Sequence, residues 1–145
     1  MKKKVLFLIL VLGLCFTGCS KEKKLECSSF DKSDLYYLDN ITTVTLKNDK
    51  ITKIKMEIYN TINDKELKKK KKTYFEKIRN LYDGYDDLTG VNVLYDEDGY
   101  TLSIVIEGNV SAMDDEAKKT FNLSDPKTTY DDLKKNFEDK GYICK

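Results

Sequence analysis

The sequence contains no histidine and no tryptophan, and it has a single proline among its 145 residues. Without histidine, the chain has no imidazole general base, no Ser-His or Cys-His nucleophilic pair and no imidazole metal ligand. Without tryptophan, it lacks a common aromatic stacking anchor. Arg79 is the one arginine beside 25 lysines, so bidentate recognition of phosphate or carboxylate groups is poorly provided for.

The residues that are present are enough for one folded domain. Ten tyrosines and six phenylalanines supply bulk for a hydrophobic core, although 35% of the residues are charged. The length suits one domain, and no internal repeat, proline-rich linker or Gly/Ser tract marks a boundary. We therefore predict a single domain over residues 25–145.

The first 18 residues have the organisation of a secretory signal. Three lysines at positions 2–4 precede an apolar stretch from Val5 to Phe16, which is interrupted only by Gly13. This stretch is shorter than the ~20 apolar residues that a membrane-spanning helix needs. Charged residues follow at once, at positions 21–24. We predict a signal peptide over residues 1–18 and a short polar tether over residues 19–24.

The end of the signal, Phe16-Thr17-Gly18-Cys19, resembles the lipobox of bacterial lipoproteins. The resemblance implies that the Cys19 thiol receives diacylglycerol, with acyl chains such as palmitate, and becomes the new N-terminus. Phe16 departs from the leucine usual at that position, and Cys15 fits less well because bulky Leu14 precedes it. An ordinary secretory signal or an uncleaved anchor are the alternatives. Two acyl chains suffice for stable attachment to the extracytoplasmic face of the cell membrane.

The domain that remains after removal of residues 1–18 is not basic. It has 23 lysines and arginines against 25 aspartates and glutamates, because three lysines leave with the signal. No overall field would attract it to nucleic acid, so we expect no nucleic-acid partner.

Two cysteines, Cys27 and Cys144, remain near the two ends of the domain. Outside the cytoplasm a disulfide persists, and this one would close a loop of about 117 residues. Two free thiols or a reactive pair are the alternatives. With no Cys-x-x-Cys motif and no histidine, we expect no metal site and no cofactor.

Alternation of apolar and polar residues predicts two β-hairpins. In the first, over residues 41–59, a three-residue loop at 48–50 would place Val44 opposite Ile54 and bring both apolar sets to one face. In the second, a two-residue Asp98-Gly99 turn would place Tyr95 opposite Leu102. A short first strand is expected over residues 25–30.

Helical spacing predicts three helices. The first covers residues 64–82, with a buried stripe at Leu67, Tyr74, Ile78, Leu81 and Tyr85. The second is short and polar, over 111–121. The third begins after Thr129, buries Tyr130, Leu133 and Phe137, and ends at Gly141. The predicted fold is α+β, an antiparallel sheet built from two hairpins with helices packed on one face.

Several short motifs in this order resemble the YehR-like lipoproteins of bacteria. They are the lipobox, the hairpin segment Lys47–Ile51, a lysine-rich central helix, the second hairpin beginning Gly90-Val91, and the C-terminal pattern Tyr130-x-x-Leu133 with Glu138-x-x-Gly141-Tyr142. The resemblance spans residues 16–142. It implies a small membrane-anchored α+β domain and carries over no catalytic residue.

Three kinds of residue are candidates for function. The lysine run Lys68, Lys69, Lys70, Lys71 and Lys72 could dock on anionic lipid headgroups or wall polymers, or could form a solvated helix face. Acidic clusters at 83–87 and 96–99 fit turn chemistry better than calcium, because Leu94 holds the first EF-hand ligand position. Tyrosines could line a glycan or peptide groove, or could pack at core edges: Tyr36, Tyr37, Tyr59, Tyr74, Tyr82, Tyr85, Tyr95 and Tyr100.

These observations favour a non-enzymatic binding or accessory protein of the cell envelope, with an envelope protein or a glycan as partner. The alternative is a small hydrolase that uses paired carboxylates on envelope material.

Overall fold

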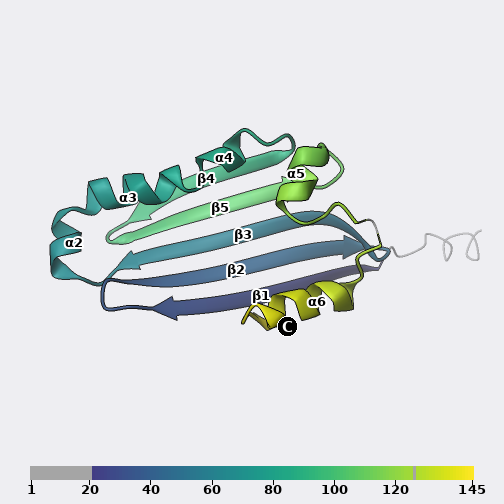
Figure 1. The fold of residues 1–145 in the computed structure, drawn as a ribbon, viewed down its shortest axis with the longest axis horizontal. Helices are drawn as coiled ribbons and strands as arrows, with labels where there is room; N and C mark the ends of the chain where they lie inside the picture. The colour runs from purple at the N-terminus through teal and green to yellow at the C-terminus, as the bar shows by residue number, and fades with distance from the viewer. Residues whose placement is uncertain (1–20, 126) are drawn as a thin grey trace, which may run out of the picture.

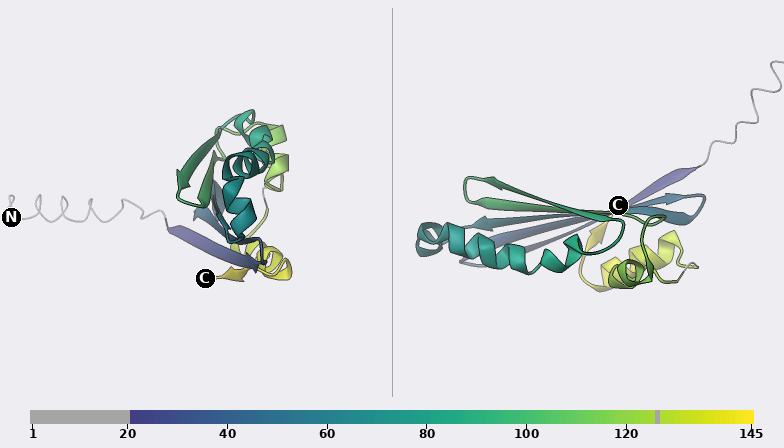
Figure 2. Two further views of the ribbon diagram at one scale, coloured as in Figure 1. Left: turned by 90° about the vertical axis from the view of Figure 1, so that its left-hand side faces the viewer. Right: turned by 90° about the horizontal axis from the view of Figure 1, so that it is seen from above.

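The computed structural model describes residues 21–125 and 127–145. These residues form a twisted antiparallel sheet of six strands, with the helices on one of its faces (Figures 1 and 2). The predicted signal peptide and the predicted lipidation site Cys19 lie outside the described residues. The elements are β1 (Glu22–Lys32), β2 (Tyr36–Lys47), β3 (Lys50–Ile62), α2 (Lys65–Lys69), α3 (Lys71–Asn80), α4 (Asp83–Asp86), β4 (Val91–Asp98), β5 (Thr101–Asn109), α5 (Asp115–Thr120), α6 (Tyr130–Asp139) and β6 (Ile143–Cys144).

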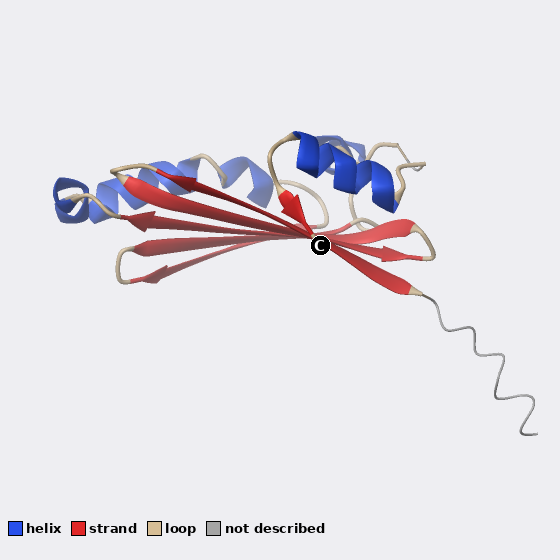
Figure 3. Ribbon diagram, turned by 90° about the horizontal axis from the view of Figure 1, so that it is seen from below, coloured by secondary structure: helices blue, strands red, loops and turns tan. Residues whose placement is uncertain are grey.

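The strand order is β4-β5-β3-β2-β1-β6, with every neighbouring pair antiparallel. The two predicted hairpins are present, and the pairing of β3 with β5 joins them into one sheet. Figure 3 shows the helices together on one side of the strands. The predicted α+β class is therefore confirmed.

The first strand is longer than predicted. β1 begins at Glu22 and pairs with β2 over its whole length, from Glu22 opposite Lys47 to Lys32 opposite Tyr37. The last three residues of the predicted tether, 22–24, therefore belong to the sheet. The ladder to β2 extends the strand, because the hydrogen bonds of β2 are available well beyond the apolar residues of β1.

The first hairpin reaches the predicted register by a different route. Its turn has two residues, Asn48 and Asp49, at φ 52° and 60°, so the predicted three-residue loop is wrong. A β-bulge at Thr52 then restores the pairing of Val44 with Ile54. Positive φ at both turn positions is typical of a type I′ turn, which matches the strand twist, and the bulge returns the apolar side chains to one face.

The second hairpin is displaced by two residues from the predicted register. Its turn is Gly99-Tyr100, and Tyr95 lies opposite Ile104 instead of Leu102. Gly99 has φ 57° at the first turn position, where a type II′ turn takes glycine. A shift of two residues keeps every side chain on its predicted face, so the apolar pattern could not detect the error.

The predicted helix over residues 64–82 is divided into α2 and α3, with α4 following. Lys70 leaves helical geometry at φ −108° and ψ 22°, and its N–H donates to the Leu67 carbonyl at 3.0 Å. The tight turn rotates the buried face, so Phe75 is fully buried whereas Leu81, predicted as buried, is 71% exposed.

The core has two parts that lie over different ends of the sheet. One is formed by β3, β4 and β5 beneath α3, and consists of Ile58, Ile62, Phe75, Val93, Leu102, Ile104 and Ile106. The other lies near α5 and α6, and consists of Leu25, Cys27, Val44, Leu46, Ile54, Met113, Ala117 and Leu123. The middle of the helix-bearing face of the sheet lies between these two parts of the core.

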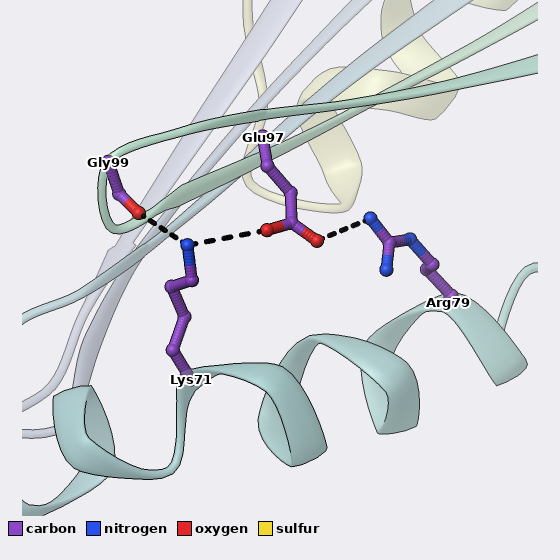
Figure 4. A network of polar contacts seen from close by, with 4 residues as sticks. All are labelled: Lys71, Arg79, Glu97 and Gly99. Carbon is purple, nitrogen blue, oxygen red and sulfur yellow. Dashed lines mark hydrogen bonds and ion pairs between the residues drawn. The ribbon is translucent and has the colours of Figure 1, made fainter.

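An ion-pair network joins α3 to the second hairpin. The Glu97 carboxylate accepts a hydrogen bond from the Arg79 guanidinium at 2.6 Å and faces the Lys71 ammonium at 3.4 Å (Figure 4). Lys71 also donates to the Gly99 carbonyl at 3.2 Å. The hydrogen bond from Arg79, with that from Lys71, lowers the pKa of Glu97 below its ordinary value.

Replacing Glu97→Gln is expected to lower stability at neutral pH only. A depressed folded-state pKa contributes stability above the unfolded value of 4.5, and this contribution is lost as the pH falls through the folded value. Because the pair is at the surface, we expect a loss of no more than about 1 kcal/mol at pH 7. Urea unfolding at pH 7 and pH 2.5 measures it. Glu76→Gln, on the exposed side of α3, is the matched control, and an equal effect of both variants would contradict the prediction.

Candidate functional site

A cleft lies on the helix-bearing face between α6 on one side and α4 with the end of α5 on the other. Its volume is about 540 Å³. We call it the central cleft. Its apolar and aromatic lining comes from seven residues: Ile54, Met56, Tyr85, Phe121, Leu133, Phe137 and Tyr142. Such a mixture of aromatic walls and a polar rim is typical of binding sites for small ligands.

The floor of the cleft is the pair Thr42 and Met56, which lie opposite each other on β2 and β3. The neighbours of Met56 on the same face, Ile54 and Ile58, are buried at 6% and 3% exposure, whereas Met56 is only partly buried. The helices therefore leave the sheet accessible at this point. A flexible thioether side chain there adapts to ligands of different shape.

The α6 wall is fixed at both of its ends. At the start, the Thr129 hydroxyl accepts from the Asp132 N–H, and the Asp132 carboxylate accepts from the Thr129 N–H at 3.0 Å, which is a capping box. At the end, Gly141 has φ 87°, and the Tyr142 N–H donates to the Phe137 carbonyl. This Schellman motif folds Tyr142 back onto Phe137, with ring centroids 5.4 Å apart. The predicted start and stop of this helix are confirmed.

The opposite wall depends on the end of α5. Asp114 begins this helix by accepting from the Ala117 N–H at 2.9 Å, so the helix is shorter than the predicted 111–121. The helix ends at Thr120, and Asn122 follows with φ 56°, so that the Leu123 N–H donates back to the Lys118 carbonyl. This turn holds the Phe121 ring 5.6 Å from the Tyr85 ring of α4. Two helix ends thus place aromatic rings on facing walls.

The rim of the cleft is polar and carries both signs of charge: Asn122, Asp125, Lys127, Asp132, Asn136 and Lys140. Hydrogen bonds from the Thr129 side chain and backbone lower the pKa of Asp132, so this carboxylate is ionised and engaged in capping. Burial, together with Tyr85 and Tyr142, raises the pKa of Tyr82, the residue just before α4. The rim can both donate hydrogen bonds to a polar ligand and accept hydrogen bonds from it.

The structure tests the predicted cysteine pair directly. Cys27 and Cys144 form a disulfide that joins β1 to β6, at directly opposed positions of the ladder. Glu26 and Lys145 exchange both backbone hydrogen bonds beside it, at 3.3 and 2.8 Å. The predicted structural disulfide is confirmed.

The lysine run lies at the end of the sheet opposite to the start of β1 (Figure 1). Lys69 pairs with Glu66 at 2.6 Å, and Lys71 with Glu97. The Lys68 ammonium lies 5.0 Å from the centroid of the Tyr100 ring. Lys70 and Lys72 are exposed. The run is therefore partly engaged within the protein, and it is not part of the central cleft.

Of the tyrosines proposed for a groove, Tyr85 lines the central cleft. The sequence did not indicate the other large apolar side chains of the walls as site residues: Phe121, Leu133, Phe137 and Tyr142. The signal that could have found Tyr142 is the aromatic residue directly after the helix-ending Gly141, because a Schellman motif brings that residue onto the helix. Elsewhere, within the described residues, no group of three Cys, Asp or Glu side chains is placed to hold a metal ion.

The sheet order and the one-sided arrangement of the helices define a YehR-like α+β fold. The NMR structure of the YehR protein of E. coli is similar with a TM-score of 0.63 at 15% sequence identity, over 87% of this chain and 92% of that one. The NMR structure of a protein from Streptococcus pneumoniae TIGR4 is similar with a TM-score of 0.54 at 12% identity, over 89% and 88%. At such low sequence identities, these similarities concern the fold alone. No protein family matches the sequence, and no curated protein matches it. Among the described helices, none has the length and apolar character needed to cross a membrane.

Proposed function

We propose that this protein is a lipoprotein, anchored through Cys19 to the extracytoplasmic face of the cell membrane, that binds an envelope glycan in the central cleft without catalysing a reaction. The lipobox-like sequence before Cys19 supports the anchoring, and the YehR-like fold agrees with the family that the sequence motifs resemble. The disulfide supports an oxidising compartment, because such bonds persist outside the cytoplasm.

The observation that carries the binding role is the cleft with aromatic walls on both sides and a floor at which Met56 is only partly buried. A sugar ring has apolar C–H faces, which pack on aromatic rings, and hydroxyl groups, which need paired donors and acceptors. The side-chain amides of Asn122 and Asn136 on the rim supply both, and both residues are exposed. These features favour a saccharide over a purely apolar ligand.

Cys19→Ser is expected to abolish labelling of the full-length chain by palmitate in growing cells. The lipid joins the Cys19 thiol, and a hydroxyl does not replace it. Cys15→Ser is the matched control, four residues earlier in the same segment, and it should keep its label. Intact mass should show the wild-type chain beginning at Cys19 and carrying lipid. A wild-type mass that begins at Met1, or equal labelling of both variants, would contradict the proposed anchoring.

Asn136→Ala is expected to weaken binding of an oligosaccharide of N-acetylglucosamine by about tenfold, the effect of losing one to two hydrogen bonds. Asn80→Ala, at the exposed end of α3, is the control and should bind as the wild type does. The purified lipoprotein in detergent is titrated by NMR, with tyrosine ring signals as the readout. If the tyrosines of the cleft respond to an extended peptide and not to the saccharide, the glycan assignment is wrong.

A further inference from the structure

The start of β1 and the tip of the first hairpin lie together at one end of the sheet. Antiparallel pairing places Glu22 opposite Lys47, and the Asn48 N–H donates to the Lys21 carbonyl at 3.2 Å. Figure 1 shows this end of the sheet at the right, where the described chain begins, with α5 beside it. We call it the tether-end surface, defined by Lys21, Lys23, Lys24, Lys47, Lys50 and Lys53.

This surface is basic although the domain is not. Residues 21–24 and 47–53 hold six lysines against two acids, Glu22 and Asp49. All six lysines are exposed. Within the described residues, Lys23 alone of the six has an ion-pair partner, Asp49 at 3.4 Å. Lys47 lies directly opposite Lys50 across the turn, and like charges so placed destabilise a hairpin. Five of the six lysines therefore have no ion-pair partner among the described residues.

A second cavity adjoins the same surface, between the hairpin and α5. Its volume is about 580 Å³. Ile51, Val110 and Leu123 give it apolar walls, and its charged rim consists of Lys50, Lys118, Lys119, Asp115 and Asp125. An apolar cavity with lysines on its rim matches an amphiphile that has an anionic headgroup.

We propose that the tether-end surface docks on anionic phospholipid, with a lipid headgroup at the rim of this second cavity. The proposal rests on the proposed anchoring through Cys19. Two residue steps separate Cys19 from Lys21, so the chain can extend by only about 7 Å between them. This reach is shorter than the Debye length of about 8 Å at physiological ionic strength. The anchor would therefore hold Lys21, and the hairpin tip that is hydrogen-bonded to it through Asn48, close to the surface charge of the membrane.

The lysine run of α2 and α3 does not fit this role. β3 has 13 residues and separates the two ends of the sheet by about 40 Å, which is several Debye lengths. With the tether-end surface on the lipid, the run points away from the membrane, toward any anionic polymer of the envelope. The central cleft then opens above the lipid surface.

Vesicle reconstitution tests the docking. The lipidated chain is inserted into vesicles of phosphatidylcholine alone or mixed with phosphatidylglycerol, and acylation of each lysine by an amine reagent is followed by mass spectrometry. We expect Lys47 and Lys50 to react about fivefold more slowly in the anionic vesicles, an effect lost at high salt. Lysines 68–72 should react equally in both. Equal rates at Lys47 and Lys50 in the two vesicles would overturn the proposal.

Two double charge-reversal variants test whether the lipid dependence requires the lysines of the tether-end surface. Lys47→Glu with Lys50→Glu should remove the lipid dependence of labelling at Lys21 and Lys53, whereas Lys69→Glu with Lys70→Glu should leave it intact. Circular dichroism confirms that both variants fold, and a variant that does not fold is replaced by the corresponding glutamine pair. If the intact mass lacks lipid on Cys19, the proposed anchoring fails and the docking fails with it. If lipid is present but lysine rates are insensitive to phosphatidylglycerol, the docking alone is wrong.

Discussion

Replacing Cys27 and Cys144 together with alanine is expected to lower the free energy of unfolding by about 3 kcal/mol. The bond joins residues 117 positions apart, and cross-linking a loop of this length restricts the unfolded chain strongly, up to ~4.7 kcal/mol in the chain-entropy model. In the native state it fixes β6, a strand of only two residues. Urea unfolding of the oxidised wild type and the double variant measures the difference.

Two controls separate the bond from its surroundings. The reduced wild type should unfold with the double variant, because both lack the cross-link. Ser28 and Ile143 form the neighbouring pair of the same ladder, and Ile143 is 73% exposed, so alanine at both should change stability by less than about 1 kcal/mol. Equal stability of the double variant and the oxidised wild type would contradict the prediction.

The disulfide also bears on the cleft. Cys144 lies two residues after Tyr142, which the turn at Gly141 folds onto Phe137, so the bond ties the end of α6 to β1. Without it, the two residues of β6 with their hydrogen bonds, and the packing of partly buried Tyr130, Leu133 and Phe137 on the core, hold this wall to the sheet. We therefore expect faster amide exchange in α6 than in α3 when the bond is reduced, because α3 packs through fully buried Phe75.

Period-two patterns predicted the sheet well because they report which face a side chain occupies. Val44 and Ile54 are paired as the parity argument required, and Tyr95 lies on its predicted face despite the shifted register. The same property explains the errors. A two-residue turn followed by a bulge at Thr52 gives the same faces as a three-residue loop, and a slip of two residues leaves the faces unchanged, so the pattern cannot distinguish these alternatives.

The helices were harder to predict from the sequence than the strands, because the lysine run has no hydrophobic periodicity. Residues 68–72 are alike all round a helix, so the sequence did not indicate the turn at Lys70 or the resulting burial of Phe75 in place of Leu81. The sequence did not predict the central cleft, for a different reason. Thr42, Tyr85 and Phe137 come from segments far apart in the chain, and only the sheet order brings them together.

Gly90→Ala is expected to destabilise the protein by about 3 kcal/mol. Gly90 has φ 76°, which costs an L-residue roughly 1–2 kcal/mol. A Cβ atom there would also lie 2.7 Å from the carbonyl carbon of Ala112 and 2.8 Å from the Met113 nitrogen, and backbone atoms cannot rotate away as a side chain would. Overpacking of this kind costs about 1–3 kcal/mol more. Urea unfolding of the variant measures the total.

Two other glycines separate the backbone strain from the close approach. Gly99 has φ 57° with nothing within 4 Å of a Cβ position, so Gly99→Ala should lose only the strain of about 1–2 kcal/mol. Gly84 lies in α4 with open space and no positive φ, so Gly84→Ala should be neutral or gain up to ~1 kcal/mol. The stability order is therefore Gly84→Ala, Gly99→Ala, then Gly90→Ala. If Gly90→Ala is no less stable than Gly99→Ala, the segment at Ala112 moves aside, and the close approach at Gly90 adds no cost to the backbone strain.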